Sequence, residues 1–65
     1  MDVSIYENHQ KAVLHYTYFL VGKKELAEDL THDTFVKAYK NPKQIGTLEG
    51  QRAWLFTIAR NTVYD

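Results

Sequence analysis

Residues 24–42 read KELAEDLTHDTFVKAYKNP and have the pattern of one amphipathic helix. Successive helical residues are rotated by about 100°, so apolar residues three or four positions apart build one apolar side. Pro42 disfavours helical geometry at Asn41, so we expect a helix from about Lys24 to Tyr39. Its core arc holds Leu26, Ala27, Leu30, Thr34, Phe35 and Ala38, and its charged arc holds Glu25, Glu28, Asp29, His32, Asp33 and Lys40, with Val36 among these charges.

The preceding segment predicts a first helix that starts at Ser4. Ser4 followed by Glu7 has the spacing of a capping box, in which a hydroxyl and a carboxylate satisfy backbone N–H groups at the helix start. Gly22 is suited to end this helix because glycine adopts left-handed backbone geometry without steric cost. The expected apolar arc comprises Ile5, Tyr6, Ala12, Val13, Tyr16, Phe19 and Leu20, with Glu7, Lys11 and His15 opposite.

The segment after it predicts a loop and then a last helix. Residues 41–50, NPKQIGTLEG, hold the proline and two of the three glycines, and loops of this length are often functional. The last helix is expected to begin near Glu49–Gln51 and to run to the end of the chain. The expected fold is therefore all-α, a small bundle of three main helices with an irregular loop before the last one. The expected buried arc of the last helix comprises Trp54, Leu55, Phe56, Ile58, Ala59, Thr62 and Val63. For Trp54, at the edge of this arc, core packing is the favoured interpretation.

Length and composition exclude several classes of protein. A chain of 65 residues fits one small domain. Cysteine is absent, which excludes disulfides, thiolate zinc sites and a cysteine nucleophile, and favours an intracellular protein. No apolar run reaches the roughly 18–20 residues of a membrane helix, so no membrane insertion is expected. The net charge is zero, yet residues 1–35 carry three lysines against six acids (−3), and residues 36–65 carry five cations against two acids (+3). This split suggests two faces with different partners, and chance scatter of charges in a short chain is the alternative interpretation.

Two long motifs resemble a known family. AEDLTHDTFVKAYKN (27–41) followed by RAWLFTIARNTVYD (52–65) is similar to region 2, the N-terminal domain, of the extracytoplasmic-function (ECF) sigma factors in the sigma-70 family. The resemblance runs from about Tyr6 to Asp65. It implies that residues 1–65 are one region 2 domain, a fragment that lacks the region 4 domain, which reads the −35 element.

The resemblance also implies a function without enzymatic activity or a cofactor. Region 2 docks on the clamp helices of the largest subunit of core RNA polymerase. It recognises and helps melt the −10 element of the promoter, and one flipped non-template base enters a pocket made largely by the loop. Further expectations are an anti-sigma factor as partner and a bacterial cytoplasmic, nucleoid-associated location.

The charged arc of the second helix is the expected polymerase-binding surface. Asp29, Asp33 and Val36 follow the spacing i, i+4, i+7, and Glu28 and His32 flank them. Two carboxylates beside an exposed aliphatic side chain suit a basic, partly apolar helical partner. A solvated acidic face with one exposed valine is the alternative interpretation.

The loop and the last helix are the expected DNA-binding surface. Separated strands require cations for phosphates, planar or amide groups for bases, and a pocket for an extruded base. Ile45 stands where many members of the family carry an aromatic ring, and an aliphatic side chain packs but does not stack. A plain solvated helix face and ordinary turn glycines are the alternatives. The candidates are Lys43, Ile45, Gly46, Arg52, Thr57, Arg60, Asn61 and Tyr64, with Gly50 also suited to close backbone approach and Lys37 and Lys40 as further cations.

Two other functional classes compete with this interpretation. A metalloenzyme would use His9, His15 or His32, but the chain has no HExxH motif, EF-hand loop or phosphate loop. A helical protein-interaction module without DNA function would explain the acidic face equally well. Such a module has no need of the basic loop or the polar arc of the last helix.

Overall fold

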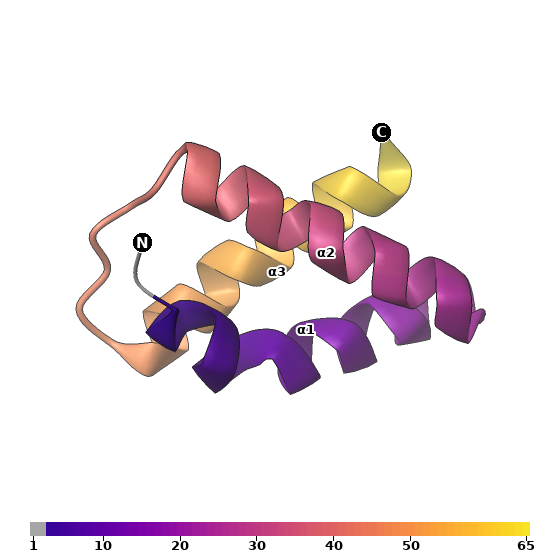
Figure 1. The fold of residues 1–65 in the computed structure, drawn as a ribbon, viewed down its shortest axis with the longest axis horizontal. Coiled ribbons are helices and arrows are strands. Elements are labelled where there is room, and N and C mark those ends of the chain that lie inside the picture. Colours follow the sequence, from indigo (N-terminus) through magenta and orange to yellow (C-terminus); the bar gives the residue numbers. More distant parts are fainter. Residues whose placement is uncertain (1–2) are drawn as a thin grey trace.

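The computed structural model describes residues 3–65, and these form three α-helices: α1 (Ser4–Val21), α2 (Lys24–Lys40) and α3 (Leu48–Tyr64) (Figure 1). The described part of the chain contains no β-strand. The all-α prediction, with an irregular loop before the last helix, is therefore confirmed. Within residues 3–65, no helix combines the length and the apolar character needed to cross a bilayer.

The ends of α1 and α2 lie where glycine and proline predicted them. Gly22 has a φ of 74°, in the left-handed region, and its N–H donates to the carbonyl oxygen of Tyr18 at 2.8 Å. The N–H of Asn41 donates to Lys37 O at 3.1 Å, and Pro42 follows outside the helix. Gly22 therefore fixes the turn between α1 and α2, and Pro42 fixes the point where the loop begins.

The starts of the helices differ from the predictions in their capping residues. The N-cap of α1 is Val3, which makes no side-chain capping bond, and Ser4 is the first helical residue. The capping box proposed for Ser4 and Glu7 is therefore wrong, although the boundary at Ser4 is right. The physical reason is a shift of one position: the N–H of Glu7 donates to the backbone oxygen of Val3 at 3.0 Å, so the first turn closes one residue earlier.

Helix α3 starts at Leu48, slightly before the predicted start. Thr47 is its N-cap, and the Thr47 Oγ1 accepts a hydrogen bond from the Gly50 N–H at 3.0 Å. The connecting loop is therefore 41–47, and Gly50 is a helical residue. The expectation that Gly50 gives a nucleotide access to loop backbone is wrong.

The three helices enclose a small core. α1 and α2 run antiparallel, and α3 crosses behind them in the view of Figure 1. The ring of Tyr16 stacks on that of Phe56, with centroids 4.4 Å apart, and Tyr6 meets the ring of Phe35 edge-on at 5.0 Å. Trp54 packs against the core, as predicted. The core cluster consists of Val13, Phe35, Ala38, Leu55 and Ala59, with Ile5, Tyr39 and Ile58 among the partly buried neighbours.

The predicted apolar arcs were broader than the buried faces. Phe19 is 83% exposed, and Tyr6 and Leu26 are also exposed. Phe19 is rotated by about 120° from Val13, the centre of the buried side of α1, so neither neighbouring helix covers it. The buried positions of α1 on either side of Val13 are instead polar, namely His9 and Thr17.

Candidate functional site

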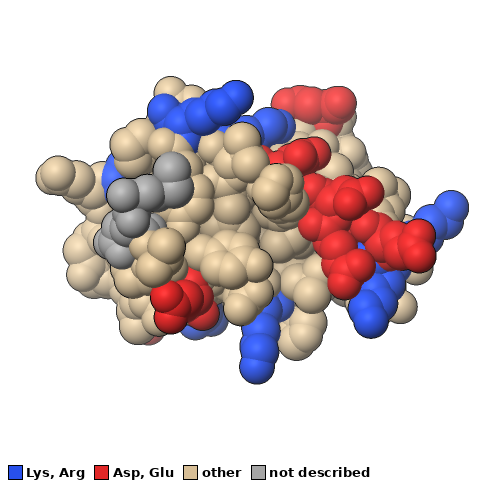
Figure 2. Space-filling view, in the orientation of Figure 1, with Lys and Arg blue, Asp and Glu red and all other residues tan. Residues whose placement is uncertain are grey.

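The predicted polymerase-binding residues of the second helix lie on an exposed face of α2. Asp29, Asp33 and Val36 are all exposed and fall within an arc of about 60°. Figure 2 shows acidic side chains gathered over the N-terminal half of α2. The arrangement offers two carboxylates and one aliphatic contact on one accessible surface, which we call the acidic face.

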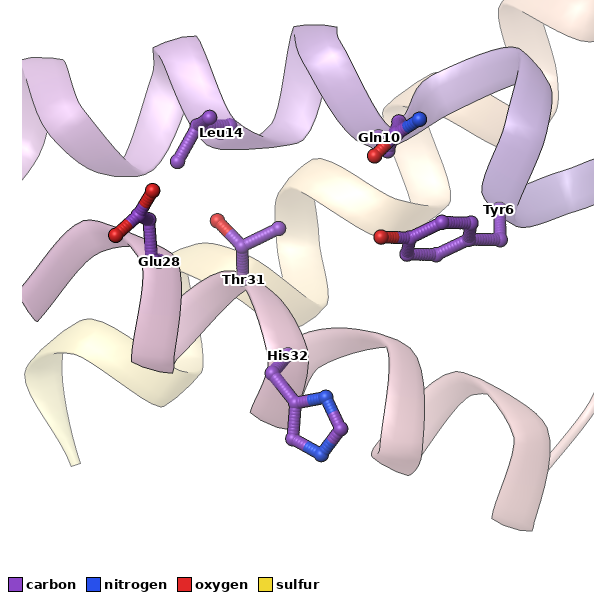
Figure 3. A pocket seen from close by; sticks show the side chains of 6 residues that line it. All are labelled: Tyr6, Gln10, Leu14, Glu28, Thr31 and His32. Atoms are coloured by element: carbon purple, nitrogen blue, oxygen red, sulfur yellow. The ribbon is translucent and has the colours of Figure 1, made fainter. Parts of the chain in front are cut away.

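Glu28 and His32 border a groove between α1 and α2. Tyr6, Gln10 and Leu14 line its α1 side, and Glu28, Thr31 and His32 line its α2 side. In Figure 3 the Glu28 carboxylate and the Thr31 side chain point into the space between the helices, whereas the His32 ring points away from α1. The groove therefore places a carboxylate beside an apolar and aromatic wall, next to the acidic face. The sequence analysis found Glu28 and His32 but did not predict their α1 partners.

The loop and the first turn of α3 form a shallow pocket. Three of the predicted DNA-binding residues, Lys43, Ile45 and Gly46, line it together. Lys43 and Gly46 are exposed, and Ile45 is half-buried. The sequence analysis missed the other members of this loop pocket, which are Ile5, Gln44 and Gln51. Ile5 comes from the opposite end of the chain, and no local pattern reveals that it meets the loop.

Specific contacts hold Ile45 against the start of α3. The Gln51 Nε2 donates a hydrogen bond to the carbonyl oxygen of Ile45 at 3.1 Å. Gly50 leaves room for the Ile45 side chain, because a Cβ added at Gly50 would lie only 2.6 Å from Ile45 Cγ2. These contacts hold Ile45, one wall of the loop pocket, against the first turn of α3.

The polar side of α3 continues from this pocket. Thr57, Asn61 and Tyr64 are exposed and form what we call the α3 stripe. Asn61 is rotated by only about 20° from Gly50 and lies about 17 Å further along the helix. Gly50 contacts the Ile45 side chain, so the Ile45 wall of the loop pocket lies at the start of the side of α3 that carries the α3 stripe, with the half-buried Trp54 between them. Gln51, the α3 residue that lines the pocket, is rotated by about 80° from Asn61. One nucleotide cannot span that distance, but a strand of several nucleotides can.

The two arginines of α3 lie in different places. Arg60 is exposed and flanks the α3 stripe, rotated by about 100° from Asn61. Arg52 is also exposed, but helix geometry rotates it by about 180° from Asn61, to the side of the buried Ala59. The structure thus joins Lys43, Ile45 and Gly46 in one pocket and places Thr57, Arg60, Asn61 and Tyr64 along one side of α3. Arg52 does not line the pocket and lies on the opposite side of α3 from Asn61. Another cation, Lys37, donates to Thr62 Oγ1 at 3.0 Å.

The histidines of the metalloenzyme alternative do not come together. His9 is buried and pairs with Gln51, whereas His15 and His32 are exposed. Across residues 3–65 there is no group of three or more His, Cys, Asp or Glu side chains placed to hold a metal ion.

Curated relatives of the chain share one description. The chain is 38% identical over 63 residues to the ECF RNA polymerase sigma factor SigL of Mycobacterium tuberculosis, an alignment that covers 95% of this chain and 36% of that protein. It is 45% identical over 65 residues to the ECF RNA polymerase sigma factor BldN of Streptomyces coelicolor, covering 94% and 24% respectively. It is 34% identical over 58 residues to the RNA polymerase sigma factor YlaC of Bacillus subtilis, covering 89% and 34%.

The chain therefore spans about a third or less of the length of these relatives. No solved structure matches the chain significantly. The family model described as Sigma-70 region 2 matches residues 5–65, which is nearly the whole chain and includes α2, the loop pocket and the α3 stripe. The chain belongs to the Sigma-70 region 2 family.

Proposed function

We propose that this chain is the part of an ECF RNA polymerase sigma factor that docks on core polymerase and recognises and helps melt the −10 element in transcription initiation. The observation that carries the proposal is that Ile45, a wall of the loop pocket, lies against Gly50 at the start of the side of α3 along which the α3 stripe follows. The family membership and the names of the relatives support the same role. An anti-sigma partner and a bacterial cytoplasmic location belong to this proposal.

The acidic face of α2 docks on the clamp helices of the largest polymerase subunit. Asp29 and Asp33 present two exposed carboxylates, and Val36 adds an accessible aliphatic contact that is 37% exposed. A partly basic helix satisfies both features, because it brings cations to the carboxylates and apolar side chains to the valine. The neighbouring groove, with Glu28 on one wall and Tyr6 on the other, extends the same surface.

The loop pocket and the α3 stripe bind single-stranded DNA. One non-template base leaves the stack and enters the pocket, where Ile45 supplies an apolar wall and Lys43 a cation for the adjoining phosphate. The bases next to it run along α3, where Asn61 offers both a donor and an acceptor and Tyr64 offers a ring. Unstacking costs a few kcal/mol per base, which these contacts and the polymerase together must offset.

A protein-interaction module without DNA function is the second candidate. The acidic face favours it as much as the first, since that face is a protein-binding surface in both cases. The loop pocket favours the first candidate, because an adaptor that binds only through α2 has no use for a pocket in the loop that carries the cation Lys43.

Binding to single-stranded DNA tests the proposal. Fluorescence anisotropy would be measured for short labelled strands with a randomised core at low salt, with and without a fragment of the polymerase clamp helices. We expect binding that salt weakens and that the clamp fragment strengthens. A complete lack of affinity in both conditions would refute the DNA-binding role and leave the interaction-module interpretation.

A further inference from the structure

A buried histidine of α1 is linked to the loop pocket by a chain of hydrogen bonds. His9 is only 2% exposed, and its Nε2 lies 3.0 Å from Gln51 Oε1. Gln51 in turn donates from Nε2 to the carbonyl oxygen of Ile45 at 3.1 Å. One glutamine side chain therefore joins α1 to the loop and the first turn of α3, which are distant from α1 in the sequence.

The direction of these bonds follows from the chemistry of the partners. The Ile45 carbonyl only accepts, so the amide nitrogen of Gln51 faces it and the amide oxygen faces His9. His9 must then carry its hydrogen on Nε2. The second ring nitrogen, Nδ1, is buried and has no hydrogen-bond partner among the described residues.

Packing alone does not explain why a histidine stands at this buried position. A buried polar atom without a partner is costly, and an apolar side chain at this position would avoid that cost. Within residues 3–65, the polar contact of the His9 side chain goes to Gln51, whose amide nitrogen holds the loop. The contact to the loop therefore accounts for a histidine at a core position.

Two further contacts hold the same short segment. The Ile45 side chain occupies the space that the missing Cβ of Gly50 leaves, and Thr47 caps the first turn of α3. The pocket wall is therefore fixed by side-chain and backbone contacts within residues 3–65. A site that is already in its binding shape loses less conformational entropy when its ligand arrives.

We propose that His9 and Gln51 are positioning residues that hold the Ile45 carbonyl and keep the loop pocket in the shape that captures an extruded base. The proposal rests on the base-capturing role argued above and adds the residues that prepare the pocket. Neither residue needs to contact the base: His9 is buried behind Gln51, and Gln51 acts by fixing the backbone of Ile45.

The experiment compares the unaltered chain with Gln51→Leu, which removes both hydrogen bonds while keeping similar bulk. Gln51→Glu is a second variant, because it keeps an acceptor for His9 but cannot donate to the Ile45 carbonyl. Asn8→Leu is the matched control, since it replaces an exposed amide of α1 that lines neither the loop pocket nor the groove. Circular dichroism first establishes that each variant is folded.

Two measurements follow on isotope-labelled protein by NMR. The first, without DNA, records the amide resonances of Gln44, Ile45 and Gly46. The second titrates short strands made of abasic sugar-phosphate units that carry a single central base, one strand for each of the four bases, against a strand that is abasic throughout. The ratio between the two kinds of strand isolates the contribution of the base from that of the phosphates.

We expect the unaltered chain and Asn8→Leu to bind the best one-base strand roughly tenfold more tightly than the abasic strand, the gain of a modest base contact. Both Gln51 variants should lose this gain, keep their affinity for the abasic strand, and show shifted or broadened loop resonances without DNA. Unchanged loop resonances, a retained base-dependent gain, or an equal loss for both kinds of strand would overturn the positioning role. If the unaltered chain itself shows no base-dependent gain, the base-capturing function fails, and this inference fails with it.

Discussion

Thr47 decides where α3 begins and hence how long the loop is. Its Oγ1 accepts from the Gly50 N–H, one of the N–H groups that have no partner inside a helix. We predict that Thr47→Ala lowers the free energy of unfolding by about 1 kcal/mol, the usual value of such a cap. Urea denaturation followed by circular dichroism measures this change.

The matched control for Thr47 is serine. Thr47→Ser keeps the hydroxyl acceptor, so its free energy of unfolding should stay within about 0.5 kcal/mol of the original value. Equal destabilisation by alanine and serine would mean that the hydroxyl does not contribute to the start of α3.

At the scale of helix pairs, two buried threonines join α1 to α2. The hydroxyl oxygens of Thr17 and Thr31 lie 2.8 Å apart, and both side chains are buried. We predict that Thr17→Val destabilises the fold by about 1–2 kcal/mol, because it leaves the Thr31 hydroxyl without this partner. Thermal or urea unfolding measures the effect.

The double variant tests that explanation. Replacing both hydroxyls by methyl groups removes the unpaired polar atom, so Thr17→Val with Thr31→Val should cost less than the sum of the two single changes. Thr57→Val, at an exposed position of α3, is the control and should change stability by less than about 0.5 kcal/mol. A strictly additive double variant would argue against a shared hydrogen bond.

The acidic face is a second feature at this scale, since it belongs to α2 as a whole. Asp29→Ala combined with Asp33→Ala should weaken binding to a polymerase clamp-helix fragment by about fivefold, or about 1 kcal/mol for two exposed charge contacts. Isothermal titration calorimetry measures the affinity, and circular dichroism checks that the helix is retained.

Glu7→Ala combined with Glu49→Ala is the control for the acidic face. It removes the same number of exposed carboxylates outside the acidic face, so the net charge changes equally. An equal loss of affinity in both double variants would show that the effect follows from net charge and not from the acidic face.

The helices were predictable because their signals are local. Gly22 and Pro42 mark chain positions where backbone geometry alone ends a helix, and both boundaries were found in the sequence. The sequence pattern places the start of α3 slightly too late, near Glu49–Gln51, because Gly50 resembles a loop residue, whereas Thr47 caps a helix that already begins at Leu48. A threonine after a loop and before an apolar run was the available signal.

The site was only partly predictable because half of it depends on tertiary contacts. Lys43, Ile45 and Gly46 are neighbours in sequence, and all three line the loop pocket. The bond between His9 and Gln51 joins residues 42 positions apart, and no periodicity in either helix indicates it. The prediction that Phe19 belongs to the buried arc is wrong for a related reason. The sequence pattern gives the direction of an apolar arc, whereas the neighbouring helices decide how wide the buried part of that arc is.

For the whole molecule, the distribution of charge matters more than its sum. The net charge is zero, so there is no long-range attraction to DNA from an overall positive charge. Affinity for a single strand must come from a few cations beside the proposed binding side of α3. Arg60 flanks the α3 stripe, whereas Arg52 lies on another side of the same helix. Arg60 and Arg52 therefore allow a comparison in which the same charge is removed from two different sides of one helix.

We predict that Arg60→Gln lowers the slope of log affinity against log salt concentration by about 0.7, the value for one phosphate contact with a single strand. Arg52→Gln makes the same change of charge on the same helix and should leave the slope unchanged. Anisotropy titrations over a series of salt concentrations measure both slopes. If the two variants lowered the slope equally, the strand would be responding to the charge of α3 as a whole, and the location of the DNA along one side of that helix would be wrong.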